Sequence, residues 1–379
     1  MAGFDTVFPA DSVEFCPHPD AANLLVCGTY QLDKGEDSMF PQEDDCGAYT
    51  PPDSPQTQSE AKQSRRGECL LLRVDPGHTE PFSLLQETSL PAVLDMKWCH
   101  TDPSVPPTLA IAESEGDVTL HTLQIQEGAL DKVLTVQCAP EDVLCLSLDW
   151  SNRRFSSTSL GSLVTSLSDG DLALLRSDSN TGLTVTEKWH AHDYEPWIAA
   201  WNYWDNNVVY SGGDDLKMKA WDIRRSLSEP IFVNKRFDAG VTTIQSHPYI
   251  EHLIAVGSYD STVRLFDTRK PLTPLTQAEV GGGVWRVKWH PTAQRQNDLL
   301  VACMHDGFKI VRFNLDGAGN TGFAPQGDAQ VPQWQITKRF DEHTSLAYGV
   351  DWSFGGAKDG TTLVASCSFY DHTLHWWKG

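Results

Sequence analysis

The amino-acid sequence predicts an all-β protein folded as a seven-bladed β-propeller, and three observations support this prediction. A short apolar strand that ends in or near an aromatic residue recurs seven times along the chain. Each copy is followed by a second short strand, a turn of small or acidic residues, and a third strand. The copies follow one another at roughly the length of a propeller blade, about 40–45 residues. We therefore expect residues 1–379 to form one closed ring of blades.

The repeat is clearest at residues 252–269, HLIAVGSYDSTVRLFDTR, which resemble the WD-repeat consensus. The first copy is anchored by Phe15, and the later anchors are Trp98, Trp150, Trp201, Ser246 (in place of an aromatic residue), Trp289 and Trp352. From Trp98 onward the intervals are 52, 51, 45, 43 and 63 residues. The last copy stops after its third strand at Trp376–Trp377. We expect the N-terminal segment Asp5–Phe8 to add the missing outer strand, which closes the ring and removes exposed sheet edges.

Two segments are too long for the repeat. Residues 33–67 are acidic, rich in Pro, Ser and Gln and poor in apolar side chains. Such a segment cannot bury enough apolar surface to offset the entropy of ordering it. We expect residues 33–67 to be a mostly disordered insertion in blade 1, and residues 314–333 to be a loop between blades 6 and 7.

The overall composition limits the classes of function. A formal net charge of -22 argues against direct nucleic-acid binding and favours solubility or a basic or cationic partner. No apolar run reaches the ~18 residues of a membrane span, and the N-terminus lacks the pattern of a secretory signal. The nine cysteines are scattered without a Cys-x-x-Cys pair, which indicates buried reduced thiols. We expect a cytoplasmic protein without a membrane span, a metal or a cofactor.

Some histidines and aspartates occupy positions where WD blades place a buried hydrogen-bond network. In blade 4 this network is expected from His190 or His192, Ser211, Asp215 and Trp221. The same turn position carries Asp260, Asp306 and Asp371. We interpret these residues as structural, because a buried carboxylate is tolerated when donors satisfy it. A less favoured alternative is that His190, His192 and Asp193 ligate a metal. The usual hydrolase motifs, such as Gly-x-Ser-x-Gly, do not occur.

Two positions in each copy are not explained by the scaffold. The position before the turn aspartate carries Tyr30, Ser114, Ser168, Asp214, Tyr259, His305 and Tyr370. The position four residues before the anchor carries Asp11, Leu94, Leu146, Trp197, Thr242, Trp285 and Tyr348. Both sets should face one mouth of the central channel, because the loops that carry them share one end of the ring.

Blades 4 to 7 therefore should present an aromatic wall at this mouth. Such a wall can hold a quaternary ammonium, with about 0.5–2 kcal/mol from each good ring face. Alternatively, the rings cap the channel or bind a peptide. Arg286 could anchor a carboxylate or form a structural salt bridge.

Several phrases are more specific than WD repeats in general, among them LDMKWCH, EPWIAAWNYW, GGVWRVKWHP and SCSFYDHTLHWW. Together they resemble the diphthine methylesterase family of WD-repeat proteins, from residue 10 to the C-terminus outside the two loops. The resemblance implies hydrolysis of the methyl ester of methylated diphthine, a modified histidine on elongation factor 2, before its final amidation. Elongation factor 2 is then the expected partner. The trimethylammonium group of this substrate suits the aromatic wall.

Ester hydrolysis needs a nucleophile, a base and donors to the developing oxyanion. We assign His305 as the base with His372 as second choice, and Tyr259 or Tyr370 as oxyanion donors. Water is the expected nucleophile, with Cys303 and Ser258 as alternatives. The expected substrate-binding residues are Trp197, Trp285, Tyr348, Asp214 and Arg286. The rival hypothesis is a non-catalytic adaptor that binds a peptide or protein at the same mouth.

Overall fold

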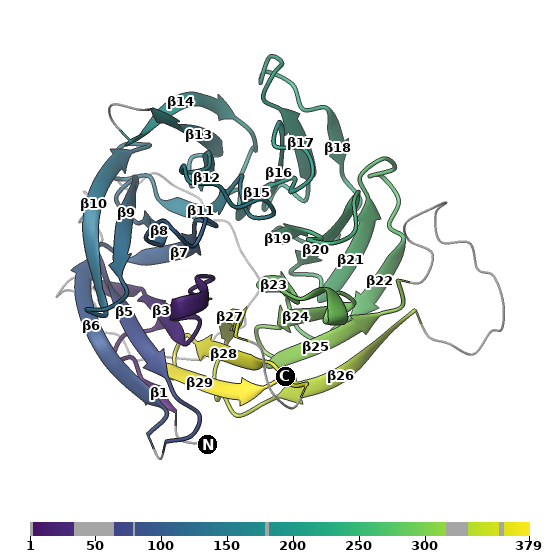
Figure 1. The fold of residues 1–379 in the computed structure, drawn as a ribbon. Helices are drawn as coiled ribbons and strands as arrows, with labels where there is room; N and C mark the ends of the chain where they lie inside the picture. The colour runs from purple at the N-terminus through teal and green to yellow at the C-terminus, as the bar shows by residue number, and fades with distance from the viewer. Residues whose placement is uncertain (1–2, 34–63, 79, 179–181, 316–332, 356–359) are drawn as a thin grey trace, which may run out of the picture.

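The computed structural model describes residues 3–33, 64–78, 80–178, 182–315, 333–355 and 360–379. The strands form seven antiparallel sheets. Figure 1 shows these sheets arranged in a ring around a common centre. Helical structure in the described residues is limited to the short 3-10 turns η1 (Pro19–Ala21) and η2 (Ala293–Arg295). These observations confirm the all-β, seven-bladed propeller.

Blades 2 to 6 are each built from four consecutive strands, with the first strand innermost. Blade 2 contains β7 (Val93–Trp98), β8 (Thr108–Glu113), β9 (Asp117–Gln124) and β10 (Ala129–Gln137). Blade 3 contains β11 (Cys145–Trp150), β12 (Leu163–Leu167), β13 (Asp171–Asp178) and β14 (Gly182–His190). Blade 4 contains β15 (Ile198–Trp201), β16 (Val208–Gly212), β17 (Met218–Asp222) and β18 (Phe232–Asn234). Blade 5 contains β19 (Val241–Ser246), β20 (Leu253–Ser258), β21 (Thr262–Asp267) and β22 (Thr276–Glu279). Blade 6 contains β23 (Arg286–Trp289), β24 (Asp298–Ala302), β25 (Phe308–Phe313) and β26 (Trp334–Phe340).

The ring is closed in blade 7 by a strand from the N-terminus. Blade 7 contains β27 (Ala347–Trp352), β28 (Leu363–Ser368), β29 (Thr373–Lys378) and β1 (Phe4–Asp5). Strand β1 runs antiparallel to β29, with Phe4 opposite Leu374. The predicted closure is confirmed, but the strand is shorter than the expected Asp5–Phe8. It ends early because Val7 has a positive φ of 65°, which breaks the extended conformation.

Blade 1 contains β2 (Ala10–Phe15), β3 (Leu24–Thr29), β5 (Ser64–Val74) and β6 (Phe82–Leu90), with β4 (Gln31–Asp33) paired to the start of β5. Asp33 and residues 64–67, expected in the disordered insertion, therefore lie in strands. Backbone pairing between β4 and β5 orders both ends, and Arg66 lies 3.1 Å from Asp33. The remaining residues of the insertion, 34–63, lie outside the described residues. In the 314–333 segment, Asn314 N donates to Gln333 O at 2.9 Å, and residues 316–332 lie outside the described residues.

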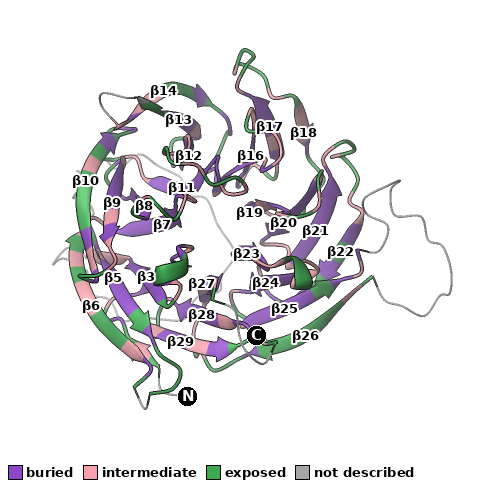
Figure 2. Cartoon of the chain, in the orientation of Figure 1, coloured by how far each residue is buried: buried purple, intermediate pink, exposed green. Residues whose placement is uncertain are grey.

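The anchor residues join neighbouring blades. The indole Nε1 of Trp150 donates to Lys97 O at 2.9 Å, and that of Trp201 donates to Asp149 O at 3.1 Å. Ser246 makes the same kind of contact, because its hydroxyl donates to Trp201 O at 3.0 Å. Figure 2 shows the consequence: the inner strands are buried between blades, while the outer strands β6, β10 and β26 carry most of the exposed positions.

Two further expectations can be compared with the described part of the chain. Its eight cysteines are all buried, and none forms a disulfide. Among the same residues, no helix has the length and apolar character needed to cross a bilayer.

Candidate functional site

A β-bulge at the start of most inner strands re-aims one side chain of the blade. The pairing register of the first two strands shifts around Asp11, Leu94, Leu146, Thr242 and Tyr348. A bulge inserts an extra residue and turns its side chain away from the regular alternation. These are the positions that the sequence singled out four residues before each anchor. In blades 4 and 6, Trp197 and Trp285 occupy the equivalent place directly before β15 and β23.

The aromatic residues of blades 4 to 7 meet in one cluster centred on Trp285. Its ring centroid lies 5.7 Å from that of Trp197, 6.1 Å from that of Tyr259 and 4.8 Å from that of Tyr348. The interplanar angle of 22° makes the contact with Tyr348 a stacked pair. Side chains from four blades therefore converge at one mouth, as the sequence positions predicted.

The cluster continues across blade 7 through a residue that sequence reasoning missed. Phe369 lies 5.0 Å from Tyr348 and 4.9 Å from Tyr370, measured between ring centroids. Tyr30 of blade 1 reaches the same ring at 6.2 Å. The signal was present in the phrase SFYDH, where Phe369 directly precedes the selected Tyr370. We define the aromatic cluster as Trp197, Tyr259, Trp285, Tyr348, Phe369 and Tyr370.

The members of the cluster differ in how far their side chains are exposed. Trp285 is 7% exposed, whereas Trp197, Tyr259 and Tyr348 are half-buried. Within the described part of the chain, the buried Nε1 of Trp285 has no hydrogen-bond acceptor. Trp285 therefore holds the other rings in place and retains an unsatisfied N–H, while its three neighbours offer the surface for a cation.

A half-buried carboxylate lies beside the cluster. Asp214 packs so closely on Gly240 that a Cβ at this glycine would collide with the carboxylate. Burial raises the pKa of Asp214, and the Trp197 side chain acts in the opposite direction. Burial raises the pKa of Tyr259 above its ordinary value, and the Asp214 charge raises it further. Asp214 therefore adds negative potential beside two of the half-buried rings.

A second carboxylate, on Asp11, is electrostatically linked to the cluster and was not assigned a role from the sequence. Burial raises the pKa of Asp11 from 3.8 to about 7, although the charge of Arg286 opposes this shift. The Asp11 charge in turn contributes to the raised pKa values of Tyr259 and Tyr348, for which burial is the main cause.

Arg286 is buried beneath the cluster. Its Nη2 lies 3.7 Å from Asp95 Oδ1, and its guanidinium lies 5.2 Å from the centroid of the Trp285 ring. Of the two interpretations from the sequence, the structural salt bridge is therefore present. Arg286 also supplies the positive charge that faces Asp11.

The two predicted histidines lie apart from the centre of the cluster. His305 is exposed and lines a groove of about 570 Å³ together with Tyr370, Arg339 and His343. His372 has a positive φ of 54°, and its carbonyl accepts from Thr6 N at 2.8 Å. Tyr259 and Tyr370 thus belong to the cluster, and Tyr370 links the cluster to the groove of His305. In the described structure, His372 belongs neither to the aromatic cluster nor to the lining of the groove.

Comparison with known proteins identifies the family. A mouse protein named diphthine methyltransferase is 37% identical over 93% of this chain and 69% of its own length. A Dictyostelium discoideum protein named diphthine methyltransferase homolog is 34% identical over 98% of this chain and 96% of its own length. This chain belongs to the diphthine methyltransferase family. A human protein of that name is 37% identical over 92% of the chain and 74% of its own length.

Two further comparisons concern the fold of this family member. The family model described as "WD domain, G-beta repeat" matches residues 230–267, which span β18 and the first three strands of blade 5. A chain in a crystal structure of the mitotic checkpoint complex aligns with a TM-score of 0.65 at 16% identity. The alignment covers 100% of this chain and 91% of that chain, and it supports the fold alone.

The expected hydrogen-bond network is present in blade 4 of this diphthine methyltransferase family member. His192 Nδ1 lies 2.8 Å from Asp215 Oδ1, and its Nε2 lies 2.7 Å from Ser211 Oγ. Trp221 Nε1 donates to the same hydroxyl at 2.9 Å. This confirms the structural interpretation and selects His192 over His190.

The residues considered as metal ligands, His190, His192 and Asp193, each interact with a different side chain. His190 pairs with Asp171 at 3.0 Å, and Asp193 pairs with Lys217 at 2.6 Å. In the described ranges, no group of three or more His, Cys, Asp or Glu side chains is arranged to hold a metal ion.

The side-chain nucleophiles considered from the sequence are both internal to their blades. Cys303 is fully buried, and burial raises the pKa of its thiol to about 12. Ser258 is buried, and its hydroxyl donates to Ala239 O at 3.1 Å. Neither side chain is therefore available as an activated nucleophile.

Proposed function

We propose that this protein hydrolyses the methyl ester of methylated diphthine on elongation factor 2 in the cytoplasm, which frees the carboxylate for the final amidation of diphthamide biosynthesis. The observation that carries the proposal is the aromatic cluster at the channel mouth. Its half-buried rings suit the trimethylammonium group of diphthine, and diphthine appears in the names of the relatives.

The cation would lie against the half-buried rings around Trp285. Each good ring face contributes about 0.5–2 kcal/mol to the binding of a quaternary ammonium. The Asp214 carboxylate adds a long-range attraction on the side of Trp197 and Tyr259. A neutral alkyl group would gain neither contribution, so the cluster would select for the charged substituent.

The hydrolytic step can be written with water as the nucleophile. A base takes one proton from water, the resulting hydroxide attacks the ester carbonyl carbon, and a tetrahedral intermediate forms. Its collapse breaks the bond to the methoxy group, which takes the proton from the base and leaves as methanol. The carboxylic acid that remains then loses its own proton to solvent and becomes the carboxylate. The neutral phenol of the half-buried Tyr259 is a donor of the kind that stabilises the developing oxyanion.

Two residues are candidates for the base. Asp11 has a pKa near neutrality and is coupled electrostatically to the cluster. His305 lies in the adjoining groove with Tyr370 and is the candidate that the sequence suggested. We favour Asp11, because its charge contributes to the raised pKa values of Tyr259 and Tyr348, two half-buried rings of the proposed cation site.

A second candidate reaction is methyl transfer, which the names of the relatives describe. The two reactions differ in direction and in requirements. A hydrolase removes one methyl group and needs only water, whereas a transferase adds a methyl group and needs a methyl donor. The adaptor hypothesis predicts binding without either change.

One experiment separates these possibilities. Purified protein is incubated with elongation factor 2 that carries the methyl ester of diphthine, without a methyl donor, and the substrate is analysed by mass spectrometry. We expect the loss of one methyl group and the release of one equivalent of methanol. An intact ester would refute the hydrolase proposal, and a gain of mass on adding a methyl donor would favour the transferase. Trp197→Ala serves as the matched variant for the cation site.

A further inference from the structure

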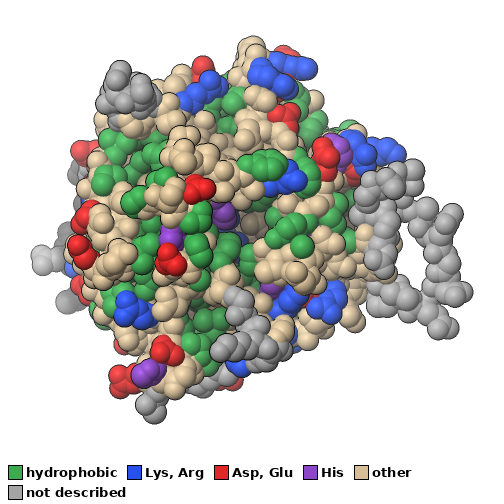
Figure 3. All heavy atoms as spheres, viewed as in Figure 1, with side chains coloured by type: hydrophobic (Ala, Val, Ile, Leu, Met, Phe, Trp, Pro, Cys, Tyr) green, Lys and Arg blue, Asp and Glu red, His purple; other side chains and the backbone are tan. Residues whose placement is uncertain are grey.

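The channel has a second mouth at the opposite end from the aromatic cluster. The inner strands begin at the cluster, and a cavity of about 470 Å³ is lined by residues that follow their anchors, among them His100, Arg153 and Phe354. A strand of six residues, such as β2, separates the two mouths by about 20 Å. The turns η1 and η2 lie on this side of the ring in Figure 1, and Figure 3 shows hydrophobic side chains around the hollowed centre of the same face.

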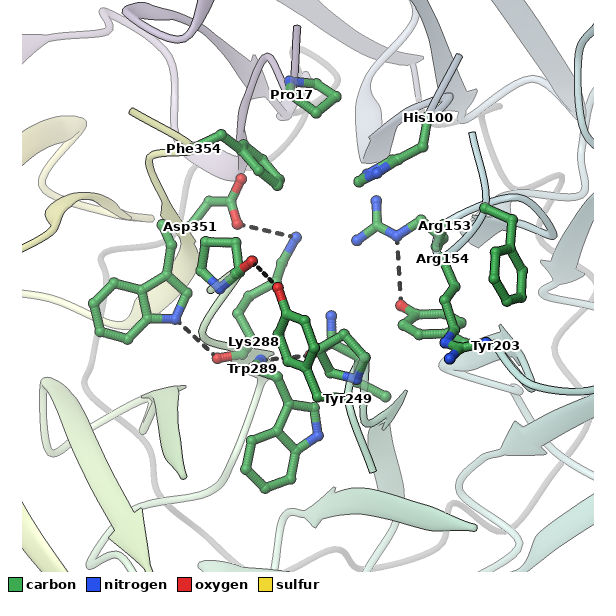
Figure 4. A pocket seen from close by; sticks show the side chains of 15 residues that line it. Pro17, His100, Arg153, Arg154, Tyr203, Tyr249, Lys288, Trp289, Asp351 and Phe354 are labelled. Carbon is green, nitrogen blue, oxygen red and sulfur yellow. Dashed lines mark hydrogen bonds and ion pairs between the residues drawn. The ribbon is translucent and has the colours of Figure 1, made fainter. Parts of the chain in front are cut away.

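A histidine and two cationic side chains converge inside this second mouth. Figure 4 shows His100, Arg153 and Lys288 extending into the same central space. Burial holds the pKa of His100 well below its ordinary value, and the charges of Arg153 and Lys288 lower it further. His100 is therefore neutral, and in the described structure its buried Nε2 has no hydrogen-bond partner.

The charge of this lining contrasts with that of the whole protein. The chain carries a net charge of -22, yet the cavity is lined by three cationic side chains and one carboxylate, Asp351. Lys288 lies 3.5 Å from Asp351 and also pairs with Glu14, and Arg153 lies 3.7 Å from Asp149. These acids balance the charges of Lys288 and Arg153. The third cation of the lining, Arg154, lies at the rim of the mouth.

Arg154 is held flat by aromatic rings. Its guanidinium carbon lies 3.3 Å from the Trp204 centroid and 4.3 Å from the Phe155 centroid. Over the described ranges, no carboxylate lies within ion-pair distance of Arg154. A guanidinium stacked in this way keeps its N–H groups in its own plane, where they can bind a carboxylate with two parallel hydrogen bonds.

The rim around Arg154 is apolar and exposed. Phe155 is 60% exposed and Tyr249 is 40% exposed, and both line the cavity. Exposed aromatic side chains around a desolvated charged centre are typical of protein-docking sites. A small acid that fills the cavity would leave these rings uncovered, whereas a peptide would cover them.

We propose that the second mouth docks an acidic peptide segment of a partner protein. A glutamate or aspartate side chain of the partner binds Arg154 at the rim, and flanking apolar residues pack on Phe155 and Tyr249. This function is separate from the proposed ester hydrolysis, because it uses the opposite end of the channel.

The test uses the full chain and an array of fluorescent decapeptides with a central glutamate between apolar residues, each matched by a peptide with glutamine in its place. Binding is measured by fluorescence anisotropy. We expect the best glutamate peptides to bind at least about tenfold more tightly than their glutamine counterparts, since a charge-assisted contact is lost. Affinity should fall as salt is raised from about 0.05 to 0.5 M.

Variants locate the binding to this mouth. Arg154→Ala and Tyr249→Ala should each weaken the glutamate peptides by about tenfold without unfolding the protein, because neither residue pairs with a buried charge. The exposed Arg225 provides the control, and Arg225→Ala should bind like the unmodified chain. Trp197→Ala, at the other mouth, should also leave peptide binding unchanged.

Three results would overturn the proposal. The first is equal affinity for glutamate and glutamine peptides, or no saturable binding by any peptide. The second is unchanged affinity in Arg154→Ala. The third is displacement of the peptide by citrate or inorganic phosphate at the concentrations at which the peptide itself binds, which would assign the mouth to a small anion. Failure of the esterase assay would affect none of these measurements.

Discussion

Replacing Asp11 by asparagine should make the folded protein more stable at neutral pH and the proposed esterase slower. Burial raises the pKa of Asp11 from 3.8 to about 7, and the nearby charges are Arg286, Asp95 and Lys97. A carboxyl with a raised folded-state pKa costs stability once the unfolded chain can ionise it. Stability is therefore lost as pH rises from about 4 to about 7, and the whole cost is present above pH 7.

The size of this effect follows from the difference between the two pKa values. At about 1.4 kcal/mol per pH unit, the range from 3.8 to about 7 corresponds to an upper limit of about 4 kcal/mol. Asparagine has nearly the shape of the protonated acid and does not ionise. Asp11→Asn should therefore gain up to about 4 kcal/mol at pH 8 and close to nothing at pH 4.

The assay pairs stability with turnover. Urea unfolding of the unmodified chain and of Asp11→Asn at pH 8, 6 and 4 gives the stability difference at each pH. Ester cleavage by the unmodified chain should rise about tenfold per pH unit up to about pH 7 and then level off, and Asp11→Asn should lose about 10²–10⁴-fold in rate. A less stable variant at pH 8 would refute the burial argument. Unchanged turnover would remove Asp11 from the mechanism.

Three further predictions concern other residues. His305→Ala should leave the melting temperature unchanged, because His305 is exposed, and should slow ester cleavage less than Asp11→Asn does; the reverse order would return the role of base to His305. Trp197→Ala should raise KM for esterified elongation factor 2 by about 3–30-fold with little change in kcat, because a ring face for the cation is lost; an unchanged KM would argue against cation binding at this ring. Ser211→Ala should lower the free energy of unfolding by about 1–3 kcal/mol in chemical denaturation, because it leaves the buried nitrogens of His192 and Trp221 unpaired; full stability would show that the network contributes nothing.

Much of the aromatic cluster was predictable because the repeat supplies a common frame for all blades. Aligning the copies identified Trp197, Tyr259, Trp285 and Tyr348 as neighbours, and their rings are in contact. The alignment could not show that Trp285 is buried under the other rings, since exposure depends on how neighbouring blades pack. Phe369 was missed for a related reason: it occupies a scaffold position and reaches the cluster through the conformation of its turn.

The histidines show what a turn sequence leaves open. His305 and His372 both occupy turn positions in the alignment, but the turn of blade 7 adopts a positive φ at His372 and bonds to the N-terminal segment. A turn sequence predicts that the chain reverses, and it does not predict the direction in which each side chain points. Asp11 was present in the alignment, but its protonation behaviour depends on burial and on Arg286, which lies far away in the sequence.

The sequence by itself determined the all-β class, the seven repeats, the closing N-terminal strand and the family, because each of these is encoded in local patterns and their spacing. The tertiary structure alone decided which side chains are buried, that burial raises the pKa of Asp11, and that His100, Arg153 and Lys288 share the second mouth. The physical reason is the closure of the ring, which brings into contact side chains from different blades whose mutual distance no single repeat specifies.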